Sequence, residues 1–449
     1  IRCRAASNVP SAVNETNPAP RLPPEAAEPF DIGATPDSLP RITRLFDELG
    51  DICRVYAPSR RSHTWLSNHP DDIKRVLVSN HRNYVKGIGF DRVRILLGNG
   101  IVTSDGELWK RQRYMMQPIF HRRVLTQFGR MIDEANDRFL AGWAAQAARG
   151  NTVNVTNDMS ALALEVILRS LFGTDLDLLA AQPGGNPFDI FTDESARDLR
   201  FAYRFRQLTK LIQQLIERRR SEPAESHFDF LGMLLAARNR ETGAGMTDRE
   251  MIDEVTTLIV AGHETTANTL NCAWYLLSQH PQVEAKMHAE IDSMPEEPAP
   301  GLARMEELGY AKSIIDETLR LYPPVWVFSR RAIDADVLSG FDLPAGTDLL
   351  LSPYHLHRHP RYWKDPEGFH PERFDAAHEA ERPRFAYMPF SAGPRHCIGE
   401  TFSVYEMLIH LSKVGRRYRL RLEHEGPVEF EAQVNLRTRH PLHMRLEPR

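Results

Sequence analysis

Apolar and polar residues follow two different periods along this chain. Between Cys53 and Asn68 they alternate in short stretches, a pattern that is typical of strands and predicts a small hairpin sheet. From Asp71 to about Ser293 the apolar residues recur mainly with helical spacing. Short strand-like stretches return at the C-terminal end. The pattern therefore predicts a mainly α protein with a small β subdomain.

Proline and glycine mark the ends of these runs. The segment from Asn17 to Gly33 is rich in proline, which lacks a backbone N–H and disfavours helix before it, so an extended arm is expected over residues 1–39. No linker or internal repeat is visible beyond this arm, and residues 40–449 are expected to form a single domain. Loop sequences occur at 181–187, 241–245 and 293–301.

The longest predicted helix begins with a capping box. Thr247 and Glu250 have the spacing of that motif, and the apolar pattern continues to Pro281, which gives about 33 residues and roughly 50 Å of helix. A helix of this length crosses a whole domain. Its middle, LIVAGHETTANTL, contains glycine and polar residues that cost stability inside a helix.

Composition narrows the class of protein. The 449 residues include 56 Lys+Arg and 60 Asp+Glu, a formal charge of -4 that does not suggest a nucleic-acid partner. Four scattered cysteines favour a reducing compartment over a disulfide framework. No apolar run approaches the roughly 20 residues of a transmembrane segment, so a cytoplasmic protein is expected. The chain begins at Ile1, and an upstream leader or anchor stays open.

The motif HETTA, which begins at His263, almost matches the signature of a zinc protease. That signature needs a second histidine four residues later, where this chain has Ala267, so the zinc site is excluded. Glu264 and Thr265 remain as an adjacent acid and hydroxyl that can relay protons beside a glycine. The alternative is a polar kink with an exposed glutamate.

Cys397 stands in the segment FSAGPRHCIGE, which begins at Phe390. A lone cysteine is more often a small buried apolar residue than a ligand. Here glycines on both sides allow close approach of a flat ligand, and a helical pattern starts at Ile398, beside the sulfur. Because N–H groups at a helix N-terminus stabilise a thiolate, Cys397 is a candidate ligand. A catalytic nucleophile is disfavoured, since the side chain of the adjacent His396 is expected to point away.

Two further pairs combine donors and charges at helical spacing. ETLR places Glu317 and Arg320 at i and i+3, and Arg373 in FHPERF can extend them into a buried charge cluster. WKRQR places Trp109 and Arg113 at i and i+4, where they can bind a carboxylate. Taken singly, each pair also fits ordinary surface charge or core packing.

In this order and spacing, the four motifs resemble the cytochrome P-450 superfamily of haem-thiolate monooxygenases. The resemblance extends from about residue 40 to the C-terminus. FSAGPRHCIG is similar to the haem-binding loop, AGHETT to the oxygen-activating helix, and ETLR with PERF to the charge cluster of the family. Ala392 stands where many members have glycine. The resemblance implies the cytochrome P-450 fold, with haem between the long central helix and the helix of the cysteine loop.

The resemblance also implies a set of cofactor ligands and catalytic residues. Cys397 would be the axial thiolate of the iron in haem b, a ligand that favours O–O cleavage. Glu264 and Thr265 would deliver protons. The other implied contacts are Trp109, Arg113, Arg330 and Arg395 at the two propionates, Phe390 on the thiolate side, Gly393 and Gly399 in the loop, and Ala261 and Gly262 in the oxygen groove.

Monooxygenation, the activity that the resemblance implies, consumes O2 and two electrons. No flavin or ferredoxin module is visible in the chain, so electrons from NAD(P)H would arrive through a separate ferredoxin or flavodoxin with its reductase. Lys110, Arg111, Arg122 and Arg123 would steer this acidic partner, with ordinary solvated charge as the alternative.

The positions that correspond to the substrate pocket of the family are mainly bulky and apolar. They imply a hydrophobic substrate such as a fatty acid, terpenoid, steroid or polyketide. Arginines at 197, 200 and 204 fit a carboxylate anchor, although a solvated helix face fits them better, and the row 325–328 fits sheet packing equally well. The implied pocket positions are 84–100, 189–211, Thr257, Ala261, Val325, Trp326, Val327 and Phe328.

Two other functions stay open at this point. A peroxygenase would use peroxide and usually lacks the acid and alcohol pair that Glu264 and Thr265 supply. A non-catalytic haem sensor for gases would usually carry an output domain, of which the sequence shows none. Hydroxylation, epoxidation and phenol coupling all use the same residues, so the sequence does not choose among them.

Overall fold

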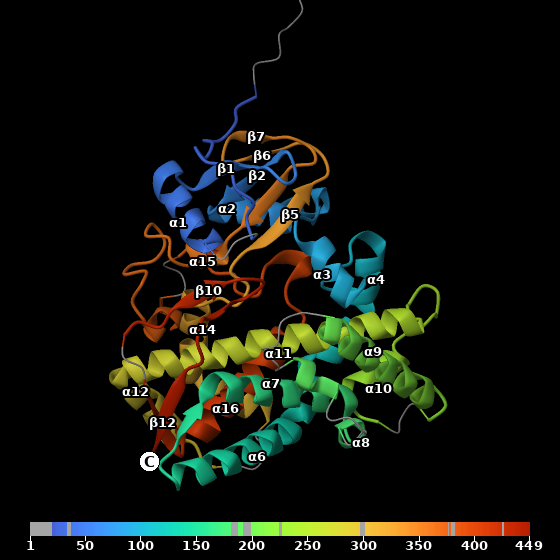
Figure 1. Cartoon of the computed structure of the whole chain (residues 1–449), viewed down its shortest axis with the longest axis vertical. Helices are drawn as coiled ribbons and strands as arrows, with labels where there is room; N and C mark the ends of the chain where they lie inside the picture. The colour runs from blue at the N-terminus through green and yellow to red at the C-terminus, as the bar shows by residue number, and fades with distance from the viewer. Residues whose placement is uncertain are drawn as a thin grey trace, which may run out of the picture.

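Helix α11, Asp248–Gln279, is the longest element of the structure and lies across its middle (Figure 1). The computed structural model describes residues 20–33, 37–180, 187–191, 199–223, 227–296, 301–375, 377–378, 382–423 and 426–449. Helices dominate these ranges and the strands form small sheets, which confirms the predicted fold class. In Figure 1 the largest sheet lies above α11, and α6, α7 and α16 lie below it.

The remaining helices vary from one turn to six. They are α1 Ser38–Leu49, α2 Pro70–Lys74, α3 Phe90–Leu97, α4 Gly106–Met116, α5 Arg122–Leu125, α6 Gly129–Ala147, α7 Val155–Phe172, α8 Asp175–Ala180, α9 Leu199–Arg220, α10 Phe230–Ala236, α12 Pro281–Ser293, α13 Leu302–Glu306, α14 Gly309–Leu321, α15 Pro353–Leu356 and α16 Glu400–Gly415.

The strands are short. They are β1 Ile52–Ala57, β2 Ser62–Ser67, β3 Tyr84–Lys86, β4 Thr152–Asn154, β5 Phe328–Ala332, β6 Asp336–Leu338, β7 Phe341–Leu343, β8 Asp348–Leu351, β9 Tyr418–Leu422, β10 Phe430–Ala432, β11 Leu436–Thr438 and β12 His443–Pro448.

The capping box predicted for α11 is present. The backbone N–H of Glu250 donates to the Thr247 hydroxyl at 3.3 Å, and the Glu250 carboxylate accepts from the Thr247 N–H at 3.0 Å. The helix continues for 32 residues and ends before Pro281. In its middle, Gly262 allows close packing against α7, because a Cβ on this residue would lie 3.0 Å from the Ile167 side chain.

The largest sheet has the order β1-β2-β8-β5-β3. β1 and β2 pair antiparallel, which confirms the predicted hairpin, and β2 pairs parallel with β8. Successive side chains of a strand point to opposite faces. Accordingly Leu349 and Leu351 join one buried cluster, and Leu350 joins another. The sheet is therefore buried on both faces, while the largest cluster fills the space among the helices.

The N-terminal residues that the structure describes lie beside β1. The Ala26 N–H donates to the Arg54 carbonyl at 2.8 Å, and the Arg54 N–H donates to the Pro24 carbonyl at 2.9 Å. Helix α1 begins at Ser38. The expected boundary between residues 39 and 40 therefore falls inside a helix, and residues 20–33 run alongside the sheet.

The predicted loop at 241–245 is present, and the other two predicted loops are described only in part. The segment 241–245 connects α10 to α11, and residues after Ser293 leave the helical path. Residues 181–186 and 297–300 lie outside the described residues. No helix in the described ranges combines the length and apolar character needed to cross a membrane.

Glu317 and Arg320 form a fully buried ion pair in α14. Arg320 donates to the two Glu317 oxygens at 2.6 and 2.8 Å, and both side chains are 0% exposed. Arg373 donates to Glu317 at 3.3 Å. Arg320 also donates to the carbonyls of His357, Pro366 and Gly368, at 2.9, 2.6 and 2.8 Å. The cluster thus ties α14 to the irregular segment that leads toward the cysteine loop.

Breaking this ion pair should destabilise the protein strongly. Glu317→Ala leaves the Arg320 guanidinium buried without its carboxylate, which is expected to cost about 3 to 5 kcal/mol in the free energy of unfolding. Urea denaturation measures this loss. The matched control is Arg439→Met, which removes a surface pair with Glu429 and should cost less than about 1 kcal/mol. Equal losses in the two variants would contradict the prediction.

Candidate active site

The loop that carries Cys397 needs glycine at one position. Gly393 has a φ of +69°, and a Cβ there would lie 2.0 Å from the Leu77 carbonyl oxygen. The Cys397 N–H donates to the Phe390 carbonyl at 2.9 Å, and the Phe390 ring is half-buried beside the main core. A Cβ on Gly399 would make only ordinary contact with the Cys397 sulfur, at 4.0 Å. The lack of a side chain at Gly393 therefore lets the loop lie directly against Leu77. At Gly399, packing would tolerate a larger residue.

The Cys397 sulfur lies beside the N-terminus of α16. Burial raises the pKa of the Cys397 thiol, while the backbone N–H groups of Gly399 and Glu400 and the Arg113 guanidinium favour its thiolate. The side chain is nevertheless accessible. The Cys397 sulfur is surrounded by protein and yet can be reached from outside, so a ligand can bind to it. The expected helix begins at Glu400, two residues after its predicted start.

Several cations gather next to this loop. Arg395 lies 4.3 Å from the Trp109 ring and donates to Asp105 at 2.5 Å and to the Ser104 carbonyl at 3.1 Å. Arg113 donates to the His396 carbonyl at 2.9 Å. Arg330 is 4% exposed, and its guanidinium donates to the Ser329 carbonyl at 2.8 Å. The structure therefore brings Trp109 and Arg113 into contact with the cysteine loop, and Arg330 close enough to Arg395 for the two charges to interact.

Lys86 belongs to the same group, although the sequence analysis missed it. It lies opposite Arg330 in the pairing of β3 with β5. Burial, together with Arg330 and Arg395, lowers the pKa of Lys86 well below its usual range. Burial and then Arg395 lower the pKa of Arg330 to about 10. Among the described residues, Asp105 is the one carboxylate that opposes these charges, so the cluster carries excess positive charge in partly buried surroundings.

The middle of α11 is accessible to solvent, unlike the rest of the helix around it. Ala261 is exposed, and Glu264, Thr265 and Asn268 are half-buried, although the turns before and after this stretch are buried. The Thr265 hydroxyl donates to the Ala261 carbonyl at 2.7 Å. His263 faces the other way, with its Nε2 2.9 Å from the Ser160 hydroxyl, and burial lowers the pKa of His263 to about 4. His263 is thus a neutral core histidine, which agrees with the exclusion of a zinc site.

Comparison with known proteins identifies the family. Residues 33–184 and 185–445 match the family model described as cytochrome P-450. Cyclooctat-9-en-7-ol 5-monooxygenase of Streptomyces melanosporofaciens is 34% identical over 431 residues, which cover 89% of this chain and 91% of the relative. Cyclooctatin synthase of the same organism is 33% identical over 86% of both chains. Pentalenene oxygenase of Streptomyces avermitilis is 32% identical over 88% of this chain and 90% of the relative.

The chain belongs to the cytochrome P-450 family. It is a haem-dependent monooxygenase, an oxidoreductase that uses O2. The described residues fit the haem group on two counts. A thiol supported by a helix N-terminus and by Arg113 suits an axial ligand. The excess of positive charge at the buried Arg330 and the partly buried Lys86 and Arg395 suits two carboxylates, such as the propionates of haem.

The predicted substrate residues do not form one surface in this cytochrome P-450. Trp326 is 1% exposed, packs in the core cluster that contains Ile42 and Leu350, and donates its indole N–H to the Gln433 carbonyl at 3.0 Å. Its assignment to the substrate pocket is therefore corrected, because sheet packing accounts for it. Val325 is 37% exposed, and Val327 and Phe328 are half-buried.

The other predicted pocket positions are described only in part. Thr257 is fully buried beneath Gly100, whose Cβ would lie 2.1 Å from the Thr257 hydroxyl oxygen. Position 197 lies outside the described residues, and at 200 and 204 the structure describes the backbone of α9 alone. The expected carboxylate anchor stays a prediction.

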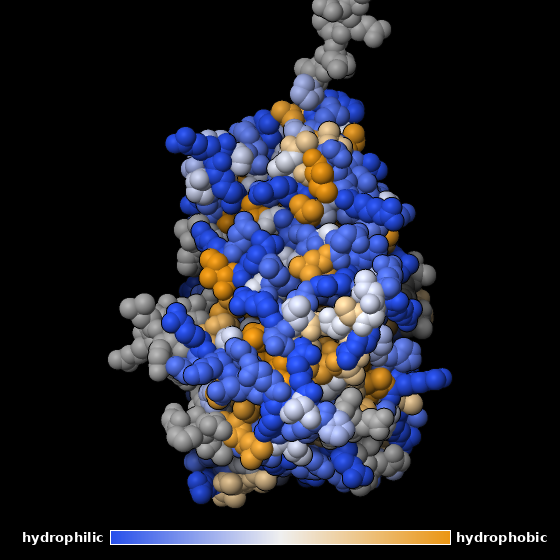
Figure 2. Space-filling model, turned by 90° about the vertical axis from the view of Figure 1, so that its right-hand side faces the viewer, coloured by the Kyte–Doolittle hydropathy of each residue, from blue (hydrophilic) through white to orange (hydrophobic). Residues whose placement is uncertain are grey.

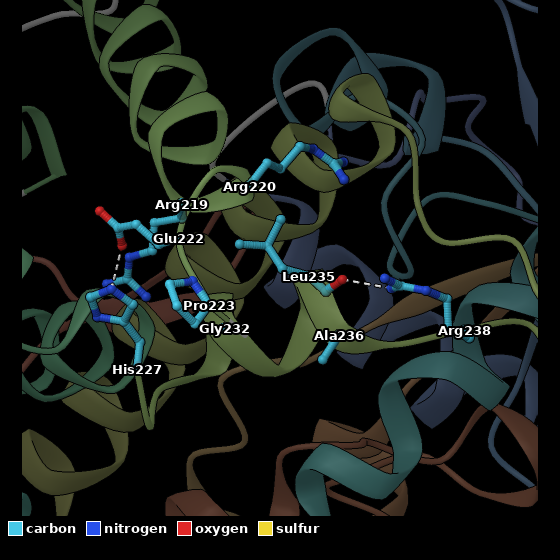
Figure 3. A pocket seen from close by; sticks show the side chains of 9 residues that line it. All are labelled: Arg219, Arg220, Glu222, Pro223, His227, Gly232, Leu235, Ala236 and Arg238. Atoms are coloured by element: carbon cyan, nitrogen blue, oxygen red, sulfur yellow. Dashed lines mark hydrogen bonds and ion pairs between the residues drawn. The ribbon is translucent and has the colours of Figure 1, made fainter. Parts of the chain in front are cut away.

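A separate pocket of about 290 Å³ lies between the end of α9 and α10 (Figure 3). Its charged side chains are engaged by the protein itself. Arg219 is bound by Asp175 and Asp229, His227 lies 2.6 Å from Glu222, and Arg238 donates to the Leu235 carbonyl at 2.7 Å. None of the predicted site residues lines this pocket.

The buried cation of Arg330 should have opposite effects on the stability of the haem-free protein and on the retention of haem. Arg330→Met removes a buried cation, so the haem-free protein should become more stable by about 1 to 3 kcal/mol, while the loaded protein should release haem faster because a propionate loses its partner. Urea unfolding of the haem-free protein and transfer of haem to an excess of scavenger protein measure the two effects.

The control for this test is the next residue of β5. Arg331 is half-exposed and paired with Asp348, so Arg331→Met should leave the rate of haem release unchanged. If Arg330→Met released haem at the wild-type rate, the assignment of this cation to a propionate would fail.

Proposed function

We propose that this cytochrome P-450 inserts one oxygen atom into a terpenoid, with Cys397 as the axial ligand of haem b. The names of two relatives support the substrate class, since one is an oxygenase of pentalenene and the other a monooxygenase of cyclooctat-9-en-7-ol. The half-buried apolar side chains of Val327 and Phe328 suit such a hydrophobic molecule. Fatty acids, steroids and polyketides are the alternatives.

The chain holds its cofactor by complementary charge. Arg113, Arg330, Arg395 and the Trp109 indole, with Lys86, would bind the two propionates through charge-assisted hydrogen bonds. When bound, haem supplies the activation of O2, and the thiolate donates electron density that favours O–O cleavage. The accessible Ala261 leaves room for a ligand beside this stretch of α11.

Glu264 and Thr265 have the positions needed to hold and move protons. The Thr265 hydroxyl donates to the Ala261 carbonyl, which leaves its oxygen lone pairs free to accept from a water or from an acid. The Glu264 carboxylate is half-buried and makes no hydrogen bond or ion pair with the described residues. No described residue therefore holds this carboxylate in place, which suits a proton carrier.

Electrons from NAD(P)H would reach this protein from a separate ferredoxin or flavodoxin with its reductase. The four basic residues expected to steer that partner differ in their surroundings. Arg111 is paired with Glu250, Arg122 with Glu306, and Lys110 lies 3.6 Å from Glu107. Arg123 is exposed and shows no ion pair among the described residues. Arg123 is thus the residue of this set whose charge is available to an acidic partner.

The surface suits association with a partner protein in the cytoplasm. On the face shown in Figure 2, hydrophilic side chains dominate and the hydrophobic ones form small separate spots. Cys53 and Cys272 are buried free thiols, which suits a reducing compartment. We therefore place the reaction in the cytoplasm.

Carbon monoxide reports the identity of the axial ligand. The reduced, CO-bound haem of the wild type should show the red-shifted absorption band of a thiolate complex, and Cys397→Ser should lose it, because a serine hydroxyl does not replace a thiolate. The control is Cys272→Ser, which changes a buried cysteine of α11, away from the cysteine loop. A red-shifted band that survived in Cys397→Ser would overturn the assignment of the ligand.

The substrate class can be tested without knowing the product. Cyclic terpenes and terpene alcohols should change the spin state of the ferric haem, whereas straight-chain fatty acids of equal carbon number should not, because the apolar side chains of Val327 and Phe328 offer a carboxylate no charge partner. Turnover should then need reductase, ferredoxin and NAD(P)H. A response to fatty acids alone would reject the terpenoid class, and efficient turnover with peroxide alone would favour the peroxygenase.

A further inference from the structure

The hairpin formed by β10 and β11 carries an exposed apolar residue at its tip. In the view of Figure 1, β10 is drawn between the largest sheet and α11. The two strands pair antiparallel from Phe430 opposite Thr438 to Ala432 opposite Leu436, so residues 433–435 form the turn. Val434, in the middle of this turn, is 62% exposed. The tip thus presents an accessible apolar side chain.

Two contacts attach the strands of this hairpin to the segment that precedes β5. The Phe430 ring stacks on the Tyr322 ring, with the ring centroids 4.2 Å apart and an angle of 14° between the planes. The Leu436 N–H donates to the Pro324 carbonyl at 2.9 Å. Both contacts are made by strand residues, so they fix the body of the hairpin rather than its turn.

Trp326 supplies the contact at the turn. Its indole N–H donates to the Gln433 carbonyl at 3.0 Å. The ring is 1% exposed and packs in a buried cluster that also contains residues of both hairpin strands. The Trp326 carbonyl accepts from the Ser352 hydroxyl at 3.1 Å and from the Tyr354 N–H at 3.3 Å. Backbone and side chain are therefore both fixed, and the indole is a rigid support for the turn.

Val325 and Val434 are neighbours across the two segments. Each lies between the two hydrogen bonds that join the segment to the hairpin, and Val325 is 37% exposed. The row that begins with Val325 continues to Phe328, whose ring lies 5.2 Å from the guanidinium carbon of Arg330, the cation assigned to a propionate. The two valines therefore extend the apolar row that leads to the cofactor.

We propose that Trp326 is a positioning residue for the substrate. Its indole N–H holds the hairpin turn against the row 325–328, so that Val434 and Val325 form one apolar edge of the substrate site. Trp326 is itself buried and does not contact the substrate. The edge limits the orientations of a bulky apolar ligand and thereby selects the carbon atom that receives oxygen. The inference rests on the proposed function, which assigns the row to the substrate.

Removal of the indole N–H tests the attachment itself. Trp326→Phe keeps an aromatic ring in the core and removes the donor to the Gln433 carbonyl. Amide hydrogen exchange in the peptide that spans 430–438 should become roughly 3- to 10-fold faster in the haem-loaded protein, because the turn loses a hydrogen bond. Exchange at the wild-type rate would show that Trp326 does not hold the turn.

The matched control is Trp363→Phe. The Trp363 side chain is also buried, at 3% exposure, and its indole N–H donates to the Leu356 carbonyl at 3.1 Å. The same chemical change is thus made away from the hairpin, so the Tm of the two variants should fall by similar amounts while the exchange of the hairpin stays unchanged in the control. Equally fast exchange in both variants would indicate a general loss of stability and would overturn the proposal.

Two ligands of different size report on the apolar edge. Imidazole and 4-phenylimidazole both bind ferric haem iron through a ring nitrogen, and only the larger one carries a phenyl group that reaches the surrounding side chains. The ratio of the Kd of 4-phenylimidazole to that of imidazole should rise roughly 3- to 10-fold in Trp326→Phe, because the edge is no longer held in place. Trp363→Phe should keep the wild-type ratio.

Two further variants separate this inference from the proposed function. Val434→Ala removes the side chain at the turn and keeps the indole hydrogen bond, so it should raise the ratio of the two Kd values without faster exchange. Phe328→Ala alters the row itself and should raise the ratio as well. If Phe328→Ala alone raised it, the row would stand and the role of Trp326 would be rejected. If none of the variants raised it, the assignment of the row to the substrate would fail together with the inference.

Discussion

The excess of partly buried positive charge beside the cysteine loop is the constraint on which the rest of this structure depends. Lys86, Arg330 and Arg395 come from two strands and a loop that lie far apart in the sequence, and each loses solvation on folding. Asp105 alone cannot neutralise them. Such a cluster persists only on a framework that is stable without it, and it gains its counter-charges when a dianionic ligand binds.

The framework that compensates for this loss of solvation contains other buried charges, and each of those charges has its full set of hydrogen-bond partners. Arg320 satisfies both oxygens of Glu317 and three backbone carbonyls, so the irregular chain before the cysteine loop is fixed without regular secondary structure. Gly393 adds a steric constraint, because only a residue without Cβ lets the loop lie against Leu77. The Glu317 and Arg320 cluster thus fixes the fold, whereas the cations beside the cysteine loop are neutralised only when a ligand binds.

The sequence predicted the elements whose signals are local. The capping box of α11, the hairpin β1–β2 and the i, i+3 pair of α14 each depend on residues within a few positions of one another, and each is present. Lys86 was missed because its role depends on the pairing of β3 with β5, some 240 residues apart, which no local pattern encodes. Trp326 was misassigned for a related reason: a row of bulky residues does not reveal that one of them points into the sheet packing.

The polar face of α11 was predicted in part from local sequence and in part became visible only from tertiary contacts. Glycine and polar residues in the middle of a helix reduce its stability, and packing against α7 and the core must compensate for them. The sequence revealed the interruption at residues 262–265, but the unpartnered atoms of Glu254 and Thr257 became visible only with the cover formed by Ile101 and Gly100. A helix selected for packing alone would place apolar side chains there. Burying an acid and a hydroxyl under a close-fitting loop costs stability, so the apolar packing of the rest of the helix must compensate for these two polar groups as well.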